Sequence, residues 1–231
     1  MQEQSYHHGN LRTALLEEAE RSVIAHGAAA LSLREIARAI GVSHTAPRRH
    51  FADRTALLDA VAQRGFDTLG LRLAEAISAA EPAFEARLRA LAHTYVDFTA
   101  GRMPLVELMY ASKHGAETMA APAAARAAYA VPYAVIEEAA RAGQLADGLG
   151  TQAAARLVFA AVHGLAVLLS TGMIASDDTP DVVNASVDGL LGGLSSTEPR
   201  IARPARARPE QRAHCLPHHG PGPERSQAAR R

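Results

Sequence analysis

The sequence predicts an all-α fold, and three observations support this class. Alanine and leucine dominate a hydrophobic fraction of 48%, whereas aromatic residues contribute only 4%. Nearly every stretch before residue 195 places its apolar residues at the 3.6-residue period of an α-helix, and no alternating run of β-branched residues recurs. A chain of 231 residues with this composition can bury a substantial core, as one large domain or two smaller ones.

Residues 32–51, SLREIARAIGVSHTAPRRHF, predict two short helices joined by a tight turn. Ser32 and Glu35 have the spacing of a capping box, in which both side chains satisfy backbone N–H groups at the start of a helix. An apolar stripe at three- and four-residue spacing follows: Leu33, Ile36, Ala37 and Ile40. Gly41 ends this helix, because glycine reaches the left-handed conformation without a side-chain clash.

The second short helix would be capped by Ser43. It must be short, because Pro47 has no backbone N–H and is tolerated only in the first turn of a helix. A glycine-bearing turn between two helices is the signature of a helix-turn-helix, whose second helix lies in the major groove of DNA. The candidate DNA-binding residues are Arg34, Ser43, His44, Thr45, Ala46, Arg48, Arg49, His50 and Arg54.

We assign two roles within this set. His44 and Thr45 are expected to face base edges with Arg34 near them, whereas the other basic residues hold phosphates. Any positive charge must be local, because the chain carries 24 basic and 24 acidic residues. Residues 1–54 hold seven arginines against six acids, and most of those acids lie before residue 21, away from the predicted contact face.

The rest of the chain before residue 195 divides into further helices at prolines and glycines. Asp53 caps a helix that begins near Thr55 and runs to about Ala79. Later helices are expected at about 82–101, 105–111, 122–142, 151–172 and 180–194. The last two are too apolar for one small domain to cover. Residues 157–173 come nearest to a membrane span but are slightly short for one and contain His163, so we expect a helix buried in a soluble core or a subunit interface.

Polar-tipped and adaptable apolar side chains concentrate between residues 93 and 163. An apolar cavity with a few hydrogen-bonding tips is what a small lipophilic effector needs, although core packing explains each residue equally well taken singly. We favour a pocket. The candidate effector-binding residues are His93, Tyr95, Phe98, Met103, Met109, Tyr110, Tyr129, Tyr133, Phe159 and His163.

Catalytic and metal-binding patterns are missing from the sequence. There is no nucleophile elbow, HExxH motif or phosphate-binding glycine loop, so we expect no catalytic residues, no cofactor and no enzyme activity. His214, Cys215, His218 and His219 offer ligand atoms, but they fall in a stretch without apolar periodicity, and we expect no metal site there. An all-α enzyme or a helical ligand carrier remains an alternative, yet neither would use Arg48, Arg49 and Arg54 around a capped turn.

Residues 9 to about 66 resemble the TetR family of bacterial transcriptional regulators. The resemblance rests on GVS followed by a basic cluster, Phe51, a short capping segment and a leucine pair. YHHGNLRTALLEEAERSVIAHG at 6–27 resembles the first helix of a subset with a Trp-His-Gly signature in its effector domain. Here Val162 stands at the tryptophan position, before His163 and Gly164. The family usually has tyrosine where Arg48 stands and often another at His50, so the operator sequence cannot be inferred.

The resemblance implies a division of labour along the chain. Residues 9–66 would form the DNA-binding domain and residues 80–195 an effector-binding and dimerisation domain. The last two long helices would pack against their symmetry mates, giving a homodimer that binds a near-palindromic operator. We expect a cytoplasmic, ligand-responsive repressor without a membrane partner; a constitutive regulator without effector is the alternative. Residues 196–231, which hold eight arginines against three glutamates, are expected to be a disordered basic tail.

Overall fold

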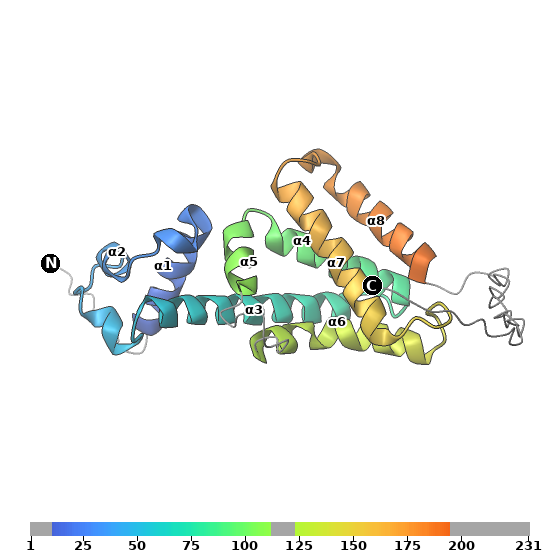
Figure 1. Cartoon of the computed structure of the whole chain (residues 1–231), viewed down its shortest axis with the longest axis horizontal. Coiled ribbons are helices and arrows are strands. Elements are labelled where there is room, and N and C mark those ends of the chain that lie inside the picture. The colour runs from blue at the N-terminus through green and yellow to red at the C-terminus, as the bar shows by residue number, and fades with distance from the viewer. Residues whose placement is uncertain (1–10, 112–122, 195–231) are drawn as a thin grey trace, which may run out of the picture. The chain divides into compact units, whose positions relative to one another are not determined.

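The computed structural model describes residues 11–111 and 123–194, and these two ranges contain helices and no β-strand (Figure 1). The all-α prediction is confirmed. In chain order the elements are α1 (Leu11–His26), the 3-10 helix η1 (Ala28–Ala30), α2 (Leu33–Ala39), the 3-10 helix η2 (Ala46–Arg49), α3 (Arg54–Ala79), α4 (Phe84–Thr99), α5 (Met103–Tyr110), α6 (Ala123–Arg141), α7 (Thr151–Ser170), the 3-10 helix η3 (Ser176–Asp178) and α8 (Thr179–Leu194).

Helix α2 ends as predicted but does not begin as predicted. Gly41 has a φ of +73°, and the N–H groups of Gly41 and Val42 donate to the carbonyls of Arg38 and Ala37 at 3.2 and 2.9 Å. This pattern is a Schellman motif, in which two otherwise unpaired carbonyls are satisfied. At the other end Ser32 occupies the N-cap position, yet its side chain makes no capping hydrogen bond. The predicted capping box is therefore wrong in its side-chain bonds.

The second helix of the motif is a 3-10 helix rather than an α-helix. Residues 43–45 form a turn in which the Ala46 N–H donates to the Ser43 carbonyl at 2.9 Å, and Thr45 rather than Ser43 occupies the N-cap position of η2. Pro47 lies in the first turn of η2 and has no N–H to donate, so a regular α-helical hydrogen-bond ladder cannot be built through it. The prediction of a short element is confirmed, and its helix type and cap were wrong.

Helix α3 lies at the centre of the described chain and contacts α1, α4, α5 and α6 (Figure 1). Its N-cap is Asp53, whose carboxylate accepts a 2.8 Å hydrogen bond from the Ala56 N–H, as predicted. Its buried stripe includes Leu57, Val61, Phe66, Leu69 and Leu73. At Gly70 an added Cβ would lie only 3.0 Å from the Ala128 Cα atom, so glycine allows the backbones of α3 and α6 to approach closely.

The remaining helices form the larger part of the core. Helix α4 contacts α6, α7 and α8, and α7 also contacts α6 and α8. The predicted ranges of α3 to α8 agree with the structure to within two residues at each end. Pro104 lies in the first turn of α5, where proline is tolerated. Residues 195–231, including the predicted tail, lie outside the described residues, and the predicted domain boundaries stay a prediction.

Helix α7 is long and apolar enough to span a membrane by length and composition alone. Its most apolar 18-residue segment has a mean hydropathy of 1.8, and 22% of that segment is buried within the chain. A core helix of a soluble protein can have the same length and composition. Because α7 packs against α4, α6 and α8, one side is covered, but Leu157 and Leu168 remain 52% and 38% exposed on the other. The structure of a single chain therefore leaves apolar surface open on α7.

The two predicted caps allow a direct test of the local structure. Asp53→Ala should lower the free energy of unfolding by about 1 kcal/mol, because the Ala56 N–H loses its acceptor. Ser32→Ala should cost clearly less, since the Ser32 side chain makes no capping bond. Urea denaturation of both variants and the wild type measures the difference. Equal losses for the two variants would contradict the observed difference between the caps.

Candidate nucleic-acid interface and ligand cavity

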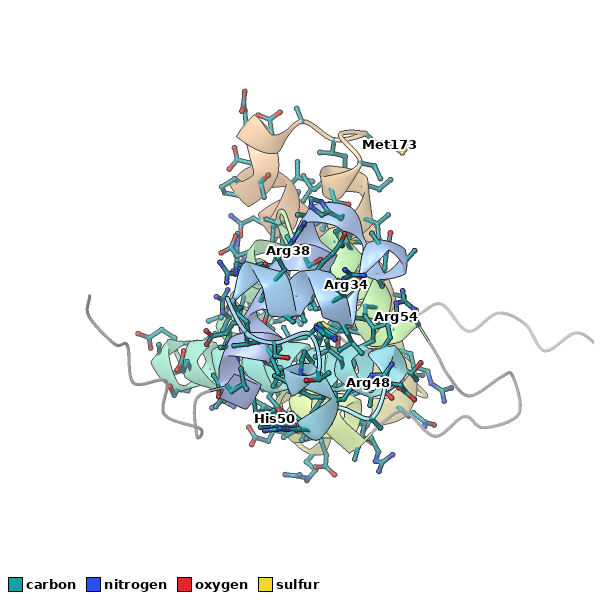
Figure 2. All side chains as sticks on the ribbon, turned by 90° about the vertical axis from the view of Figure 1, so that its left-hand side faces the viewer. Arg34, Arg38, Arg48, His50, Arg54 and Met173 are labelled. Carbon is teal, nitrogen blue, oxygen red and sulfur yellow. The ribbon has the colours of Figure 1, made fainter. Side chains whose placement is uncertain are left out.

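Basic side chains gather on the surface formed by α2, η2 and the turn between them. Figure 2 faces this end of the chain and shows Arg34 and Arg38 on α2, with Arg48 and His50 at η2. Residue exposure divides the predicted DNA-binding residues: Arg34, Ser43, His44, Thr45, Arg48, Arg49 and Arg54 are exposed, whereas Ala46 and His50 are half-buried. Most of the predicted set can thus reach a partner.

The arginines of this surface differ from many others in their lack of acidic partners. Within the described part of the chain, Arg34, Arg48 and Arg49 form no ion pair. Elsewhere acids neutralise arginines: Arg64 lies 3.1 Å from Glu20, and Arg87 lies 2.6 Å from Glu138. A surface of uncompensated guanidinium groups suits phosphate oxygens and is compatible with a chain of zero net charge.

The turn before η2 holds its polar side chains by local bonds. The Ser43 Oγ and Thr45 Oγ1 atoms lie 3.0 Å apart, and the Thr45 N–H lies 3.4 Å from the Ser43 Oγ. Pro47 is buried below them, so the exposed side of the turn is the side that carries His44 and Thr45. This placement agrees with the predicted roles of His44 and Thr45 in reading base edges, which remain a prediction.

Arg54 is placed differently from the other predicted phosphate contacts. It is the first residue of α3, and its Nε atom donates to the Leu31 carbonyl at 2.9 Å. Its Nη2 atom donates to the carbonyls of Ala28 and Ala29 at 2.5 and 3.0 Å. The sequence contained no signal for these bonds, which join residues more than twenty positions apart. Its role as a phosphate contact stays a prediction.

A cavity of about 1270 Å³ lies among α3, α4, α5, α6 and α7. Its walls are mainly apolar. The predicted effector residues that line it are Tyr95, Met109, Tyr110, Tyr129, Tyr133 and Phe159. They are joined by apolar residues that the sequence analysis did not single out, including Leu58, Ala62, Phe66, Leu91, Ile136 and Val162. This volume exceeds the roughly 300 to 1,000 Å³ of an ordinary small-molecule site, so the cavity has room for a larger ligand.

Other predicted effector residues face other parts of the fold and do not line the cavity. His93 lies with its Nε2 atom 2.9 Å from the Asn184 Oδ1 atom of α8. Phe98 is buried, with the guanidinium groups of Arg72 and Arg102 within 5.8 Å of its ring centroid. Met103 packs against the core at the start of α5. These residues lie on the apolar sides of their helices. The helical period predicts that such residues are buried, but it does not show whether they line a cavity or pack in the core.

His163 does not line the cavity itself but supports a polar cluster in its wall. The Tyr95 hydroxyl lies 2.7 Å from His163 Nδ1 and 3.5 Å from the Tyr110 hydroxyl, which also contacts the Tyr129 hydroxyl. The His163 ring stacks on Phe159 with their centroids 5.3 Å apart. Below, the hydroxyl groups of Tyr95, Tyr110 and Tyr129 with the imidazole of His163 are called the tyrosine cluster.

Burial keeps the tyrosine cluster uncharged. It raises the pKa of each of the three phenol groups and lowers the pKa of His163 below its ordinary value of 6.5. A neutral imidazole nitrogen can accept the proton of the Tyr95 hydroxyl. Since the unfolded chain binds a proton at His163 more readily, this group favours the folded state above about pH 6.5 and less so as the pH falls below that value. The cluster offers a neutral polar group inside an apolar cavity.

Charged and amide side chains also line the cavity, and the sequence analysis did not assign them. They are Asp59, Gln63, Arg126, Gln152 and Arg156. A helical period shows which residues are polar but not which polar residues border a cavity. In residues 11–111 and 123–194 no group of three or more His, Cys, Asp or Glu side chains is arranged to hold a metal ion. The histidines and the cysteine of the tail lie outside these ranges.

Comparisons with protein-family models match most of this arrangement. Residues 15–61, which include the helix-turn-helix, match the model described as bacterial regulatory proteins of the tetR family. Residues 88–194, which hold most of α4 and all of α5 to α8, match the model described as the tetracyclin repressor-like C-terminal domain. No curated protein matches the chain.

Solved structures share the fold over most of the chain. A protein with unknown function from Rhodococcus sp. RHA1 is 40% identical, with a TM-score of 0.73 over 84% of this chain and 100% of that one. A putative TetR family transcriptional regulator from Vibrio parahaemolyticus is 19% identical, with a TM-score of 0.65 over 80% and 99%. The regulator FadR from Bacillus subtilis, in complex with stearoyl-CoA, is 13% identical, with a TM-score of 0.64 over 78% and 98%.

The described chain is helical, carries a helix-turn-helix whose arginines lack acidic partners, and contains a cavity large enough for a ligand. This is the organisation of a one-component transcriptional regulator. The two family models together match more than half of the sequence, so the chain belongs to the TetR family. Members of this family are ligand-responsive, DNA-binding transcriptional regulators and mostly repressors. The predicted family and function class are confirmed.

The basic surface predicts a specific change in salt dependence. The double variant Arg48→Ala, Arg49→Ala should weaken operator binding and lower the slope of log K against log salt by about 1.8, because each lost phosphate contact contributes about 0.9. Gel shifts at several salt concentrations, on an operator found by footprinting DNA beside the gene, measure both quantities. Arg141→Ala is the matched control, because Arg141 pairs with Glu137 on α6. Wild-type affinity in the double variant would contradict the proposed contacts.

Proposed function

We propose that the protein is a cytoplasmic repressor that binds a near-palindromic operator as a homodimer and leaves it when a small lipophilic effector fills the cavity. One observation carries this proposal. Leu58, Ala62 and Gln63 line the cavity, and they belong to the same helix, α3, that begins directly after the helix-turn-helix. A ligand in the cavity therefore contacts the element that joins it to the DNA-binding surface.

The exposed side of α7 and α8 supports dimerisation. Leu157, Leu168 and Met173 are 52%, 38% and 76% exposed, although they are large apolar residues. On α8 the exposed positions include Gly189, Gly192 and Gly193, and a Cβ added at any of them would meet nothing within 4 Å. Small residues leave room for a second helix to approach. A second copy of this surface would cover the apolar residues that a single chain leaves in water.

A charge in this surface should prevent dimerisation. We expect Leu168→Arg to give monomers or aggregates and to weaken operator binding, because an unpaired charge in an interface costs several kcal/mol. Leu71→Arg on α3 is the control: Leu71 is 67% exposed and lies outside α7 and α8, so this variant should stay dimeric. Light scattering at micromolar concentration distinguishes the two. A wild-type protein that is a stable monomer under these conditions would refute the homodimer.

The walls of the cavity indicate the chemistry of the effector. Its body should be apolar, because leucine, alanine and aromatic side chains provide most of the surface. Its polar part should be a neutral oxygen, since the tyrosine cluster is uncharged and Tyr129, whose hydroxyl contacts that of Tyr110, lines the cavity. A phenol hydroxyl can donate to a carbonyl or accept from an alcohol. FadR, with the same fold, is in complex with stearoyl-CoA, so the fold can accommodate a large lipophilic ligand.

The effect of such a ligand on DNA binding follows from linkage. A ligand that favours a dimer with incorrectly spaced recognition elements weakens DNA binding by the same factor by which DNA weakens its own binding. Allosteric coupling of this kind is typically about 1 to 3 kcal/mol, which is about 5- to 150-fold in affinity. Helix α3 provides a continuous route, because it borders the cavity and starts at Arg54.

Matched long-chain ketones, alcohols and carboxylates test the proposed effector class. We expect ketones or alcohols to raise the melting temperature and to lower operator affinity. Tyr129→Phe should weaken their binding about fivefold, the value of one neutral hydrogen bond. Tyr133→Phe should not, since Tyr133 lines the outer part of the cavity and is 42% exposed.

The outcomes separate the effector from the regulator. Ligands that stabilise the protein without changing operator affinity would leave a constitutive DNA-binding regulator. Preferential binding of carboxylates, abolished by Arg156→Ala but not by Tyr129→Phe, would move the polar end of the ligand to Arg156. Binding that is unchanged in Tyr129→Phe for every probe would eliminate the tyrosine cluster as the recognition element.

A further inference from the structure

The side chain of Arg54 connects two parts of the DNA-binding region. The arginine belongs to the first turn of α3, whereas its acceptors are the carbonyls of Ala28, Ala29 and Leu31. The three bonds come from two nitrogen atoms of one guanidinium group, Nε and Nη2, so the group is held in one orientation. A planar group with several fixed N–H directions is suited to donating to several carbonyls at once, and a single ammonium group is less so.

The acceptors lie at the point where the chain leaves α1 and enters α2. Ala28 and Ala29 belong to η1, and the Ala28 carbonyl also accepts a 3.3 Å hydrogen bond from the Leu31 N–H. Leu31 precedes the N-cap of α2 by one residue, and its side chain is buried. A bond to the Leu31 carbonyl therefore restrains the place from which α2 starts.

In the described part of the chain the backbones of α2 and η2 approach that of α3 at few places, although Ile36 and Leu57 belong to the same core. Helix α2 packs on α1 and η2, whereas in the described part of the chain it shares few direct contacts with α3. The same holds for η2 and α3. The anchor itself is well held, because Asp53 caps α3 and accepts from the Ala56 N–H at 2.8 Å. Arg54 thus reaches from a capped helix start to the segment that carries α2.

We propose that Arg54 is a positioning residue for DNA recognition: its bonds to the carbonyls of Ala28, Ala29 and Leu31 hold α2 and the following turn in the place where they fit DNA. Its contribution to affinity comes from these internal bonds and not from a phosphate contact. This proposal goes beyond the repressor function and does not depend on an effector.

Two substitutions distinguish positioning from charge. Arg54→Ala removes both the hydrogen bonds and the charge. Arg54→Lys keeps the charge, but its single ammonium nitrogen cannot replace the two guanidinium nitrogens that make the three bonds. We expect both variants to weaken operator binding about tenfold, as loss of a charge-assisted hydrogen bond does, with an unchanged salt slope. Both should speed amide hydrogen exchange in residues 28–33. Arg49→Ala, in the exposed part of η2, is the control, and its salt slope should fall by about 0.9.

Opposite results overturn the proposal. Wild-type affinity in Arg54→Lys, together with a salt slope lowered by about one in Arg54→Ala, would show a phosphate contact. Affinities are corrected for the folded fraction measured by circular dichroism, so a variant that is only less stable would show wild-type affinity and would also overturn it. If Arg54→Ala does not fold, Arg54→Lys decides, and unchanged exchange in residues 28–33 of that variant contradicts a positioning role.

Discussion

The packing of α3 against α1, α4, α5 and α6 is the constraint on which the rest of the structure depends. Buried residues follow the helix from Leu57 to Leu73, and each fully buried leucine or phenylalanine stabilises the fold by about 1.5 to 3 kcal/mol. Gly70 permits the close approach of α6, since any side chain there would meet the Ala128 backbone. Because α3 packs against other helices along most of its length, a shift at one of its ends changes packing contacts at the other. This property suits a regulator whose ligand and DNA are bound at different places.

Charge is distributed so that a neutral chain presents a basic surface. Arg64, Arg87 and Arg89 form ion pairs with acids, whereas Arg34, Arg48 and Arg49 form none among the described residues. Exposed ion pairs add little to stability, about 0 to 1 kcal/mol, so leaving these arginines unpaired costs the fold little. At the proposed interface these guanidinium groups would gain phosphate oxygens as acceptors. Local pairing, and not the total charge, therefore determines which arginines are available to a phosphate.

The cavity combines two features that usually oppose each other. Polar groups removed from water are costly unless they are hydrogen-bonded, and Tyr95, Tyr110 and Tyr129 meet this requirement among themselves and with His163. The phenols are protonated at neutral pH, and burial disfavours their anions further by raising each pKa. An apolar cavity can thus contain a recognition group without a buried charge. Because the tyrosine cluster is neutral, a ligand does not need to bring an opposite charge to offset a buried one.

The sequence alone determined the helical class, the extents of α3 to α8, the Asp53 cap and the left-handed Gly41, because each depends on residues a few positions apart. It could not determine that Ser32 makes no side-chain cap, that Pro47 leads to a 3-10 helix, or that His93, Phe98 and Met103 face away from the cavity. The bonds of Arg54 lay equally beyond it. These features are set by contacts between residues distant in the chain, and only the packed helices decide which of several locally acceptable partners a side chain meets.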